Sequence, residues 1–362
     1  MKHLNNVLPY LLGIGLAIMP IHRIFFVAIA GLAIILFVSM YVVYMNWREI
    51  KKVPKVLLVL VLVLTLLAVF VPESTTYARM YIIGMLCVFL AASILGPKVF
   101  IPVGIGAIVG GLSVIVFSIV TDFTRTGGMY QVENYNLATG VILIGAVLWR
   151  CKWQWVTIPI AVLGALATGA DEAFVIIAVV GLAVLIRRDW SRRIIPTVLV
   201  VLVPIVFLLT PNNPAQKLWD TIPLSFHAVM QQTDTPQQEV VPSRQADITS
   251  DINNRWNIIT TSLKDVKLLG HGYEPDNVET STIHNVPVRV LYELGPLGLL
   301  CWLGLIIWGL LKTSWKYAFV AVIGASLFDH FMWTQLTPYF FVLLGVCTWL
   351  PKEKDWIFRS VK

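Results

Sequence analysis

The chain has 362 residues, of which 57% are hydrophobic and only 13% are charged, and its mean hydropathy is +0.79. These values exclude an ordinary soluble domain and are typical of a polytopic membrane protein. The net charge of +7 does not indicate a nucleic-acid partner, because the basic residues gather between apolar segments, where they report membrane topology.

Apolar segments follow one another along most of the chain. A helix that crosses the hydrocarbon core needs roughly 17 to 25 predominantly apolar residues, and by this measure we predict about twelve transmembrane helices. The segments are continuous rather than alternating, which indicates helices and not a barrel. In chain order they are 5–20, 23–45, 55–71, 77–95, 99–120, 136–150, 153–168, 172–187, 193–210, 286–311, 315–330 and 335–350.

The predicted fold is an all-α membrane helix bundle in three parts. Residues 1–210 hold the N-terminal transmembrane helices, residues 211–285 form one large extracytoplasmic loop, and residues 286–362 hold the C-terminal helices and a cytoplasmic tail. Lys and Arg accumulate in cytoplasmic loops, and this rule is met when both chain termini lie in the cytoplasm. The long polar segment is then extracytoplasmic.

The polar segment has two parts that differ in composition and predicted structure. Residues 230–250 are rich in Gln, Thr and Pro and are typical of a mobile linker. From Ile252, apolar residues recur at spacings of four and three, which predicts an amphipathic helix that lies on the membrane surface and ends at Gly270. Its apolar positions are Ile252, Trp256, Ile259, Leu263 and Val266.

Two histidines follow this predicted helix. His271 lies between Gly270 and Gly272, a sequence that predicts a turn, and His284 with Asn285 directly precedes Pro287. Proline is tolerated in the first turn of a helix because its missing N–H would be unpaired there. We therefore expect His284 at the mouth of the bundle, with neighbouring backbone N–H groups available to an anion.

The order of these motifs carries a resemblance. Arg255-Trp256, then His284-Asn285, then Glu293-Leu294-Gly295 resembles the O-antigen ligase and polymerase superfamily of polytopic membrane glycosyltransferases, which act on bacterial surface polysaccharides. The matched stretch covers about a quarter of the chain when the last spans are included. This resemblance implies transfer of a glycan from a polyprenyl diphosphate carrier to a hydroxyl of a glycan or lipid A–core acceptor.

The resemblance also implies a place and a mechanism. The place is the outer face of the bacterial inner membrane, and neither a metal nor a nucleotide cofactor is implied, because the energy resides in the carrier diphosphate. A diphosphate leaving group gains negative charge as the glycosidic bond breaks, and an arginine such as Arg255 stabilises that charge. The acceptor hydroxyl needs a base, for which His284 is suited.

The sequence departs from the family pattern at one position. Family members often have an arginine at the outer start of a middle span, whereas here Thr168-Gly169-Ala170 runs into Asp171-Glu172. By position, Arg289 or Arg125 is a substitute for that second cationic group. Asn285 and His271 complete the predicted substrate-binding residues.

Simpler interpretations stay open beside these. Arg289 and Glu293 are four residues apart and are also expected simply to neutralise each other. Asp171 and Glu172 are expected either to interact favourably with the dipole of the helix that follows them or to act as an alternative base. A metal site of His271 with His284 lacks further ligands at suitable spacing.

Four other functions also stay open. The first two are a polysaccharide polymerase and a protein-glycosylating transferase, which use the same donor. The third is a lipid-linked glycan transporter, and the fourth is a noncatalytic partner in envelope assembly. The concentration of charged residues beside the polar segment, rather than within several apolar segments, argues against transport.

Overall fold

The structure is a computed structural model of the whole chain. It describes residues 2–21, 24–71, 73–121, 126–130, 135–148, 154–170, 173, 176–177, 257–273, 283, 285–313, 315–328 and 333–349.

The described residues form α-helices and short 3₁₀ turns, with no strand among them. A further short helix, residues 257–264, lies in the polar segment. The principal helices are α1 (Lys2–Ile18), α2 (Phe25–Asn46), α3 (Lys55–Phe70), α4 (Thr76–Leu95), α5 (Phe100–Val120), α6 (Tyr135–Leu148), α7 (Gln154–Ala167), α13 (Val286–Lys312), α14 (Lys316–Phe328) and α15 (Thr337–Val346).

The apolar segments predicted from the sequence are helical over most of their described residues, although α15 is shorter than the predicted segment 335–350. Within the described part of the chain, four helices are long and apolar enough to cross a membrane, and six further apolar helices have 10–17 residues. The four long ones are Phe25–Ile50, Thr76–Leu95, Pro97–Val120 and Val286–Lys312. The predicted segments 172–187 and 193–210 lie almost wholly outside the described residues.

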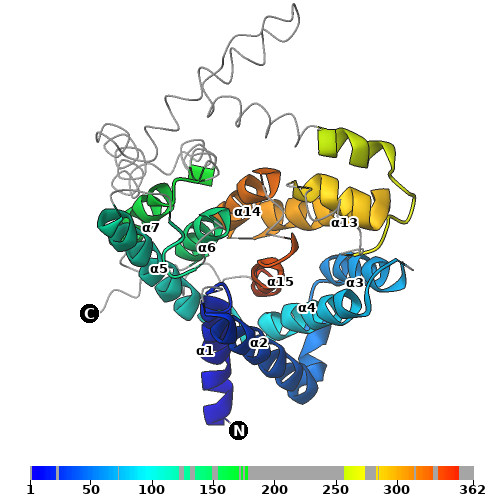
Figure 1. Cartoon of the computed structure of the whole chain (residues 1–362). Coiled ribbons are helices and arrows are strands. Elements are labelled where there is room, and N and C mark those ends of the chain that lie inside the picture. Colours follow the sequence, from blue (N-terminus) through cyan, green and yellow to red (C-terminus); the bar gives the residue numbers. More distant parts are fainter. Residues whose placement is uncertain are drawn as a thin grey trace, which may run out of the picture.

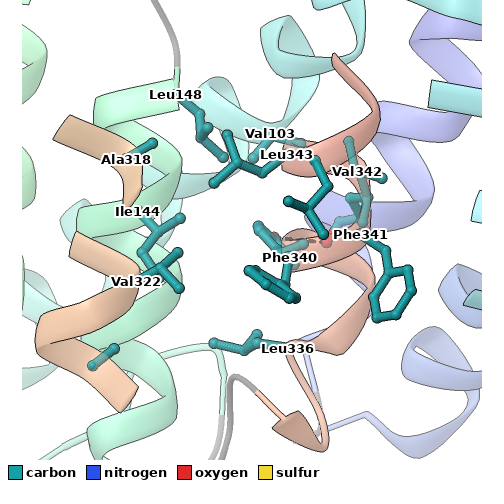
Figure 2. Packing of buried hydrophobic residues seen from close by; sticks show 14 of the residues in the cluster. Val103, Ile144, Leu148, Ala318, Val322, Leu336, Phe340, Phe341, Val342 and Leu343 are labelled. Atoms are coloured by element: carbon teal, nitrogen blue, oxygen red, sulfur yellow. Dashed lines mark hydrogen bonds between the residues drawn. The ribbon is translucent and has the colours of Figure 1, made fainter. Parts of the chain in front are cut away.

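The core of the bundle is built around α15. All ten residues of this helix are buried, and Figure 1 shows it in the middle of a ring made by the other helices. In Figure 2, Leu343 of α15 lies toward Val103 and Leu148, while Phe340 lies toward Ile144 of α6. A helix that is apolar on every side is stable either in such a buried position or in contact with lipid, and α15 has the buried position.

The outside of the ring is as apolar as its inside. Phe26 of α2 is 81% exposed, and Leu66 of α3 and Val120 of α5 are likewise exposed. Contiguous apolar surface of this extent is rare on soluble monomers and marks contact with a membrane or a partner. Together with the long apolar helices, it indicates that the chain associates with a membrane.

The predicted span 286–311 is interrupted in the structure. The resemblance implies a turn at Glu293-Leu294-Gly295 in this span, and Gly295 in α13 has φ 69° and ψ −176°, which breaks the helix there. The break separates residues 286–294 from residues 296–312, and Pro296 opens the second part. Proline fits that place because the first turn of a helix needs no N–H donor from it.

Candidate functional site

The candidate site lies at one end of the bundle, which we call the loop end. Here α3 ends, α4 begins, and residues 286–294 of α13 meet the described part of the polar segment, residues 257–273. Asn285 precedes α13 and Glu293 lies just before its break, so both sequence motifs of the C-terminal region come to this end. Figure 1 shows residues 257–273 beside α13 and coming back to the bundle near α3.

The break in α13 creates a docking place for the polar segment. Pro296 has no N–H to give to the carbonyl of Tyr292, four residues earlier, so this carbonyl needs another donor. The backbone N–H of His271 donates to the Tyr292 oxygen over 3.0 Å, and the N–H of Gly272 donates to the Glu293 oxygen over 2.8 Å. Residues 270–273, which we call the docking segment, thus complete the hydrogen bonding of the broken helix.

Close backbone approach explains why glycine occurs at this junction. Gly270 has φ 77°, and a Cβ atom there would overlap the carbonyl of Glu293. Gly295 likewise approaches the carbonyl of Leu268 too closely for a side chain. The sequence predicted a turn at Gly270-His271-Gly272, and the structure confirms it. The predicted end of the preceding helix at Gly270 is wrong, because that helix ends at residue 264.

The docking segment is also tied to the turn between α3 and α4. The backbone N–H of Tyr273 donates to Ser74 Oγ over 2.9 Å, and Ser74 Oγ in turn donates to the carbonyl of Ala68. The hydroxyl of Tyr273 donates to the carbonyl of Trp333 over 2.9 Å, and the two rings pack edge to face at 5.6 Å. Tyr273 is therefore a buried link between the polar segment and the residues that precede α15.

A buried charge network lies under this junction. Arg289 is 4% exposed and Glu293 is fully buried, and Arg289 Nε donates to Glu293 Oε1 over 2.7 Å. The other carboxylate oxygen, Oε2, accepts from Trp333 Nε1 over 2.8 Å. Both oxygens of Glu293 are engaged, so this carboxylate is arranged to hold two donors in place rather than to accept a proton from a substrate.

Asn285 has a structural position at the start of α13. Its Oδ1 accepts from the backbone N–H of Val288 over 3.0 Å, and its Nδ2 donates to the carbonyl of Leu327 near the end of α14 over 2.8 Å. This is the N-cap arrangement of a helix. It uses one of the N–H groups that the sequence predicted to be available to an anion, and Pro287 stands in the first turn as predicted.

His271 is held on every side by the chain. Its ring stacks on Tyr292 at 4.2 Å, and its Nε2 donates to the carbonyl of Asp265 over 2.6 Å. A carbonyl only accepts, which assigns a hydrogen to Nε2. Nδ1 lies 3.4 Å from Glu73 Oε2. These contacts fix the docking segment, and they are the ones a structural histidine makes.

An ion pair on the surface reinforces the docking. Lys267 Nζ donates to Glu73 Oε1 over 2.7 Å, and both side chains are about half exposed. The hydrogen bond from Lys267 is the main reason that the pKa of Glu73 lies below its ordinary value, and the same bond raises the pKa of Lys267. Because solvent screens exposed pairs, we assign this pair only a small share of the docking energy.

The Thr168-Gly169-Ala170 sequence, where the family pattern has an arginine, ends α7. Thr168 Oγ1 donates to the carbonyl of Ala165, so the 2.8 Å contact with Thr139 Oγ1 requires Thr139 to donate. The backbone N–H of Ala170 also donates to Thr168 Oγ1. This hydroxyl is therefore satisfied by its own surroundings and serves to close the helix.

Several predicted site residues lie outside the described residues. They are Arg255, His284, Arg125, Asp171 and Glu172. The structure brings Asn285, Arg289 and His271 to the same end of the bundle, where all three have partners within the chain.

Sequence reasoning missed Trp333, Glu73 and Ser74 as parts of this arrangement. The one local signal was Pro296 after Gly295, which predicts a carbonyl without its helical donor but does not say which segment supplies one. In the part of the chain that the structure describes, no three His, Cys, Asp or Glu residues gather as metal ligands do.

Comparison with known proteins adds no relative. No family model matches the chain, and no curated protein matches it either.

Proposed function

We propose that the chain is a membrane glycosyltransferase of the O-antigen ligase type. It takes a glycan from a polyprenyl diphosphate carrier and transfers it to an acceptor hydroxyl at the loop end of the bundle. The proposal includes about twelve transmembrane helices, cytoplasmic termini, and a loop end that faces outward from a bacterial inner membrane. The distribution of Lys and Arg supports this orientation.

One observation carries the proposal beyond the sequence motifs, namely the buried Arg289 at the loop end. A buried charge near a membrane is costly, and such residues commonly mark substrate sites. The guanidinium Nε donates to Glu293 Oε1 over 2.7 Å. A carboxylate that accepts a hydrogen bond from Nε also fixes the orientation of the guanidinium plane, and a fixed plane is suited to binding a diphosphate.

In the proposed reaction, the acceptor oxygen bonds to the anomeric carbon of the glycan while the bond from that carbon to the diphosphate oxygen breaks. The diphosphate, which stays attached to its polyprenyl lipid, leaves with the bonding electron pair on its oxygen, and Arg289 and Arg255 stabilise the negative charge that develops on it. His284 takes the acceptor proton. The docking segment supports this chemistry by fixing the polar segment, which contains Arg255, against α13, whose N-cap Asn285 directly follows His284.

The test is transfer of labelled glycan from a polyprenyl diphosphate donor by the purified protein in lipid nanodiscs. His284→Ala is expected to lower the rate about 10²–10⁴-fold, as loss of a general base does. His3→Ala, which replaces a histidine in the first turn of α1, serves as the matched control and is expected to be active.

Products resolved by size distinguish the subtypes. A product that requires lipid A–core means a ligase, and a ladder made from the donor alone means the alternative, a polysaccharide polymerase. No transfer to either acceptor, or equal transfer by wild type and His284→Ala, would overturn the proposal and favour a transporter or an envelope-assembly partner.

A further inference from the structure

A short turn next to the docking segment exposes three leucines. Residues 263–269, which we call the leucine-lysine turn, contain Leu263, Leu268 and Leu269, exposed at 46%, 78% and 55%. Lys264 and Lys267 lie between them. The sequence predicted that the apolar stripe with Leu263 lies on the membrane surface or on the mouth of the bundle, and in the structure Leu263 is 46% exposed.

Contacts fix the level of this turn along the bundle axis. Lys267 reaches Glu73 in the turn between α3 and α4, and the carbonyl of Leu268 approaches Gly295 at the break in α13. Helices α3 and α4 change direction at this level, and residues 296–312 of α13 begin there. The leucine-lysine turn therefore lies level with the end of α3, the start of α4 and the break in α13.

The turn also lies on the outer perimeter of the bundle. Figure 1 shows residues 257–273 outside the ring, beside α13 and ending near α3. At the same end of these two helices, Phe70 of α3 and Leu297 and Leu300 of α13 are exposed apolar residues. Leu268 and Leu269 continue this apolar perimeter directly from Gly295, two residues before Leu297.

We propose that the leucine-lysine turn is a membrane anchor that inserts into the lipid leaflet at the loop end. Leu268 and Leu269 enter the boundary between headgroups and acyl chains, while Lys264 and Lys267 stay at the level of the lipid phosphates. Apolar residues flanked by lysines bind membrane surfaces in this way, since the lysine stems are apolar and their ammonium groups stay hydrated. The partner is a phospholipid surface and not a second protein, because the turn extends the perimeter that the membrane helices already present.

This anchor gives the docking segment a second attachment. Hydrogen bonds attach residues 270–273 to α13, and lipid attaches residues 263–269. The two attachments together hold this part of the polar segment at a fixed position relative to the membrane, whatever reaction the protein catalyses. The inference depends on membrane association and not on glycosyl transfer, so it stands or falls independently of the proposed function.

The test places an environment-sensitive NBD label on Leu268→Cys, in a background whose four native cysteines are replaced by alanine. The protein is reconstituted in nanodiscs of phosphatidylcholine and phosphatidylglycerol, with or without lipids that have a doxyl quencher near the headgroup. Thr261→Cys is the matched control, because this exposed position on helix 257–264 lies about 200° of helical rotation from Leu263.

Insertion predicts that the label at position 268 emits at shorter wavelength than the label at 261, is quenched by doxyl lipid and is protected from aqueous iodide. Iodide quenching of both labels without doxyl quenching would overturn the proposal. Protection of position 268 from both quenchers would also overturn it, because that result means burial against protein. Elution of each labelled sample at the wild-type volume verifies that the exposed substitutions leave the fold intact.

Discussion

The buried pair of Arg289 and Glu293 gives the sharpest prediction about stability. Replacing Glu293 by Gln removes the carboxylate that faces the buried guanidinium, and replacing Arg289 by Gln removes the cation that faces the buried carboxylate. Removing one partner of a buried pair costs about 3–5 kcal/mol of unfolding free energy. The 2.7 Å contact and the near-complete burial of both side chains place each single substitution in that range.

The double variant Arg289→Gln/Glu293→Gln is expected to be more stable than either single variant. No lone charge is left in it, and two amides are able to bond to each other and to Trp333 Nε1. This order of stabilities requires a coupling free energy larger than the cost of either single substitution, which is more than about 3–5 kcal/mol and above the usual range of about 0.5–3 kcal/mol for contacting residues. The measurement is reversible unfolding by SDS in mixed micelles, followed by circular dichroism.

The two single variants and the double variant also distinguish two roles of the pair, namely binding of the donor diphosphate by Arg289 and neutralisation of the two charges by each other. If Arg289 binds the donor diphosphate, the double variant regains stability but transfers no glycan. If the pair only neutralises itself, the double variant regains both stability and activity, which would remove Arg289 from the proposed site. Additive losses in the two single variants would refute the pairing itself, since independent residues show no coupling.

Two further predictions concern the docking segment. Gly270→Ala is expected to destabilise the protein by about 2–5 kcal/mol, because it combines a left-handed alanine, which costs about 1–2 kcal/mol, with two weakened backbone hydrogen bonds of about 0.5–1.5 kcal/mol each. Gly304→Ala in α13 is the control, since its Cβ would lie 3.3 Å from a flexible Leu60 methyl, and equal thermal stability of the two variants would contradict the model of docking. Acid is expected to weaken the attachment of the docking segment, because the pKa of Glu73 is lowered in the folded protein. The stabilisation that ionised Glu73 provides is complete above the ordinary pKa of 4.5 and is lost as the pH falls through the lowered pKa. The rate of protease cleavage in the docking segment should therefore rise at low pH in the wild-type protein and change less with pH in Lys267→Ala. If both proteins show the same change with pH, the ion pair does not contribute to docking.

The local pattern of the sequence determined the helices and the ends of several of them. Continuous apolar segments predicted helices at 77–95 and 99–120, and the structure has helices at Thr76–Leu95 and Phe100–Val120. Pro287 predicted the start of α13 because the preference of proline for the first turn is a property of the local sequence, whereas the cap made by Asn285 was not predicted. The turn around His271 was likewise predicted from its two flanking glycines.

The roles of individual residues in the site depended on the tertiary structure. Arg289 and Glu293 are four residues apart, so their pairing was predictable, but Trp333 lies 40 residues beyond Glu293 and nothing local indicates it as the second donor. The catalytic roles of Arg255 and His284 rest on the family resemblance and stay predictions.

The sequence by itself determined that this is a helical membrane protein with one long polar segment, because hydropathy and helix period are read from consecutive residues. Only the tertiary structure decided where that segment docks. Pro296 and Gly295 leave backbone carbonyls that need donors, and any segment with free N–H groups would satisfy them locally. Packing of α3, α4 and α13 brings residues 270–273 to that place, since Ser74 and Tyr273 are 199 residues apart in the chain but joined by a hydrogen bond.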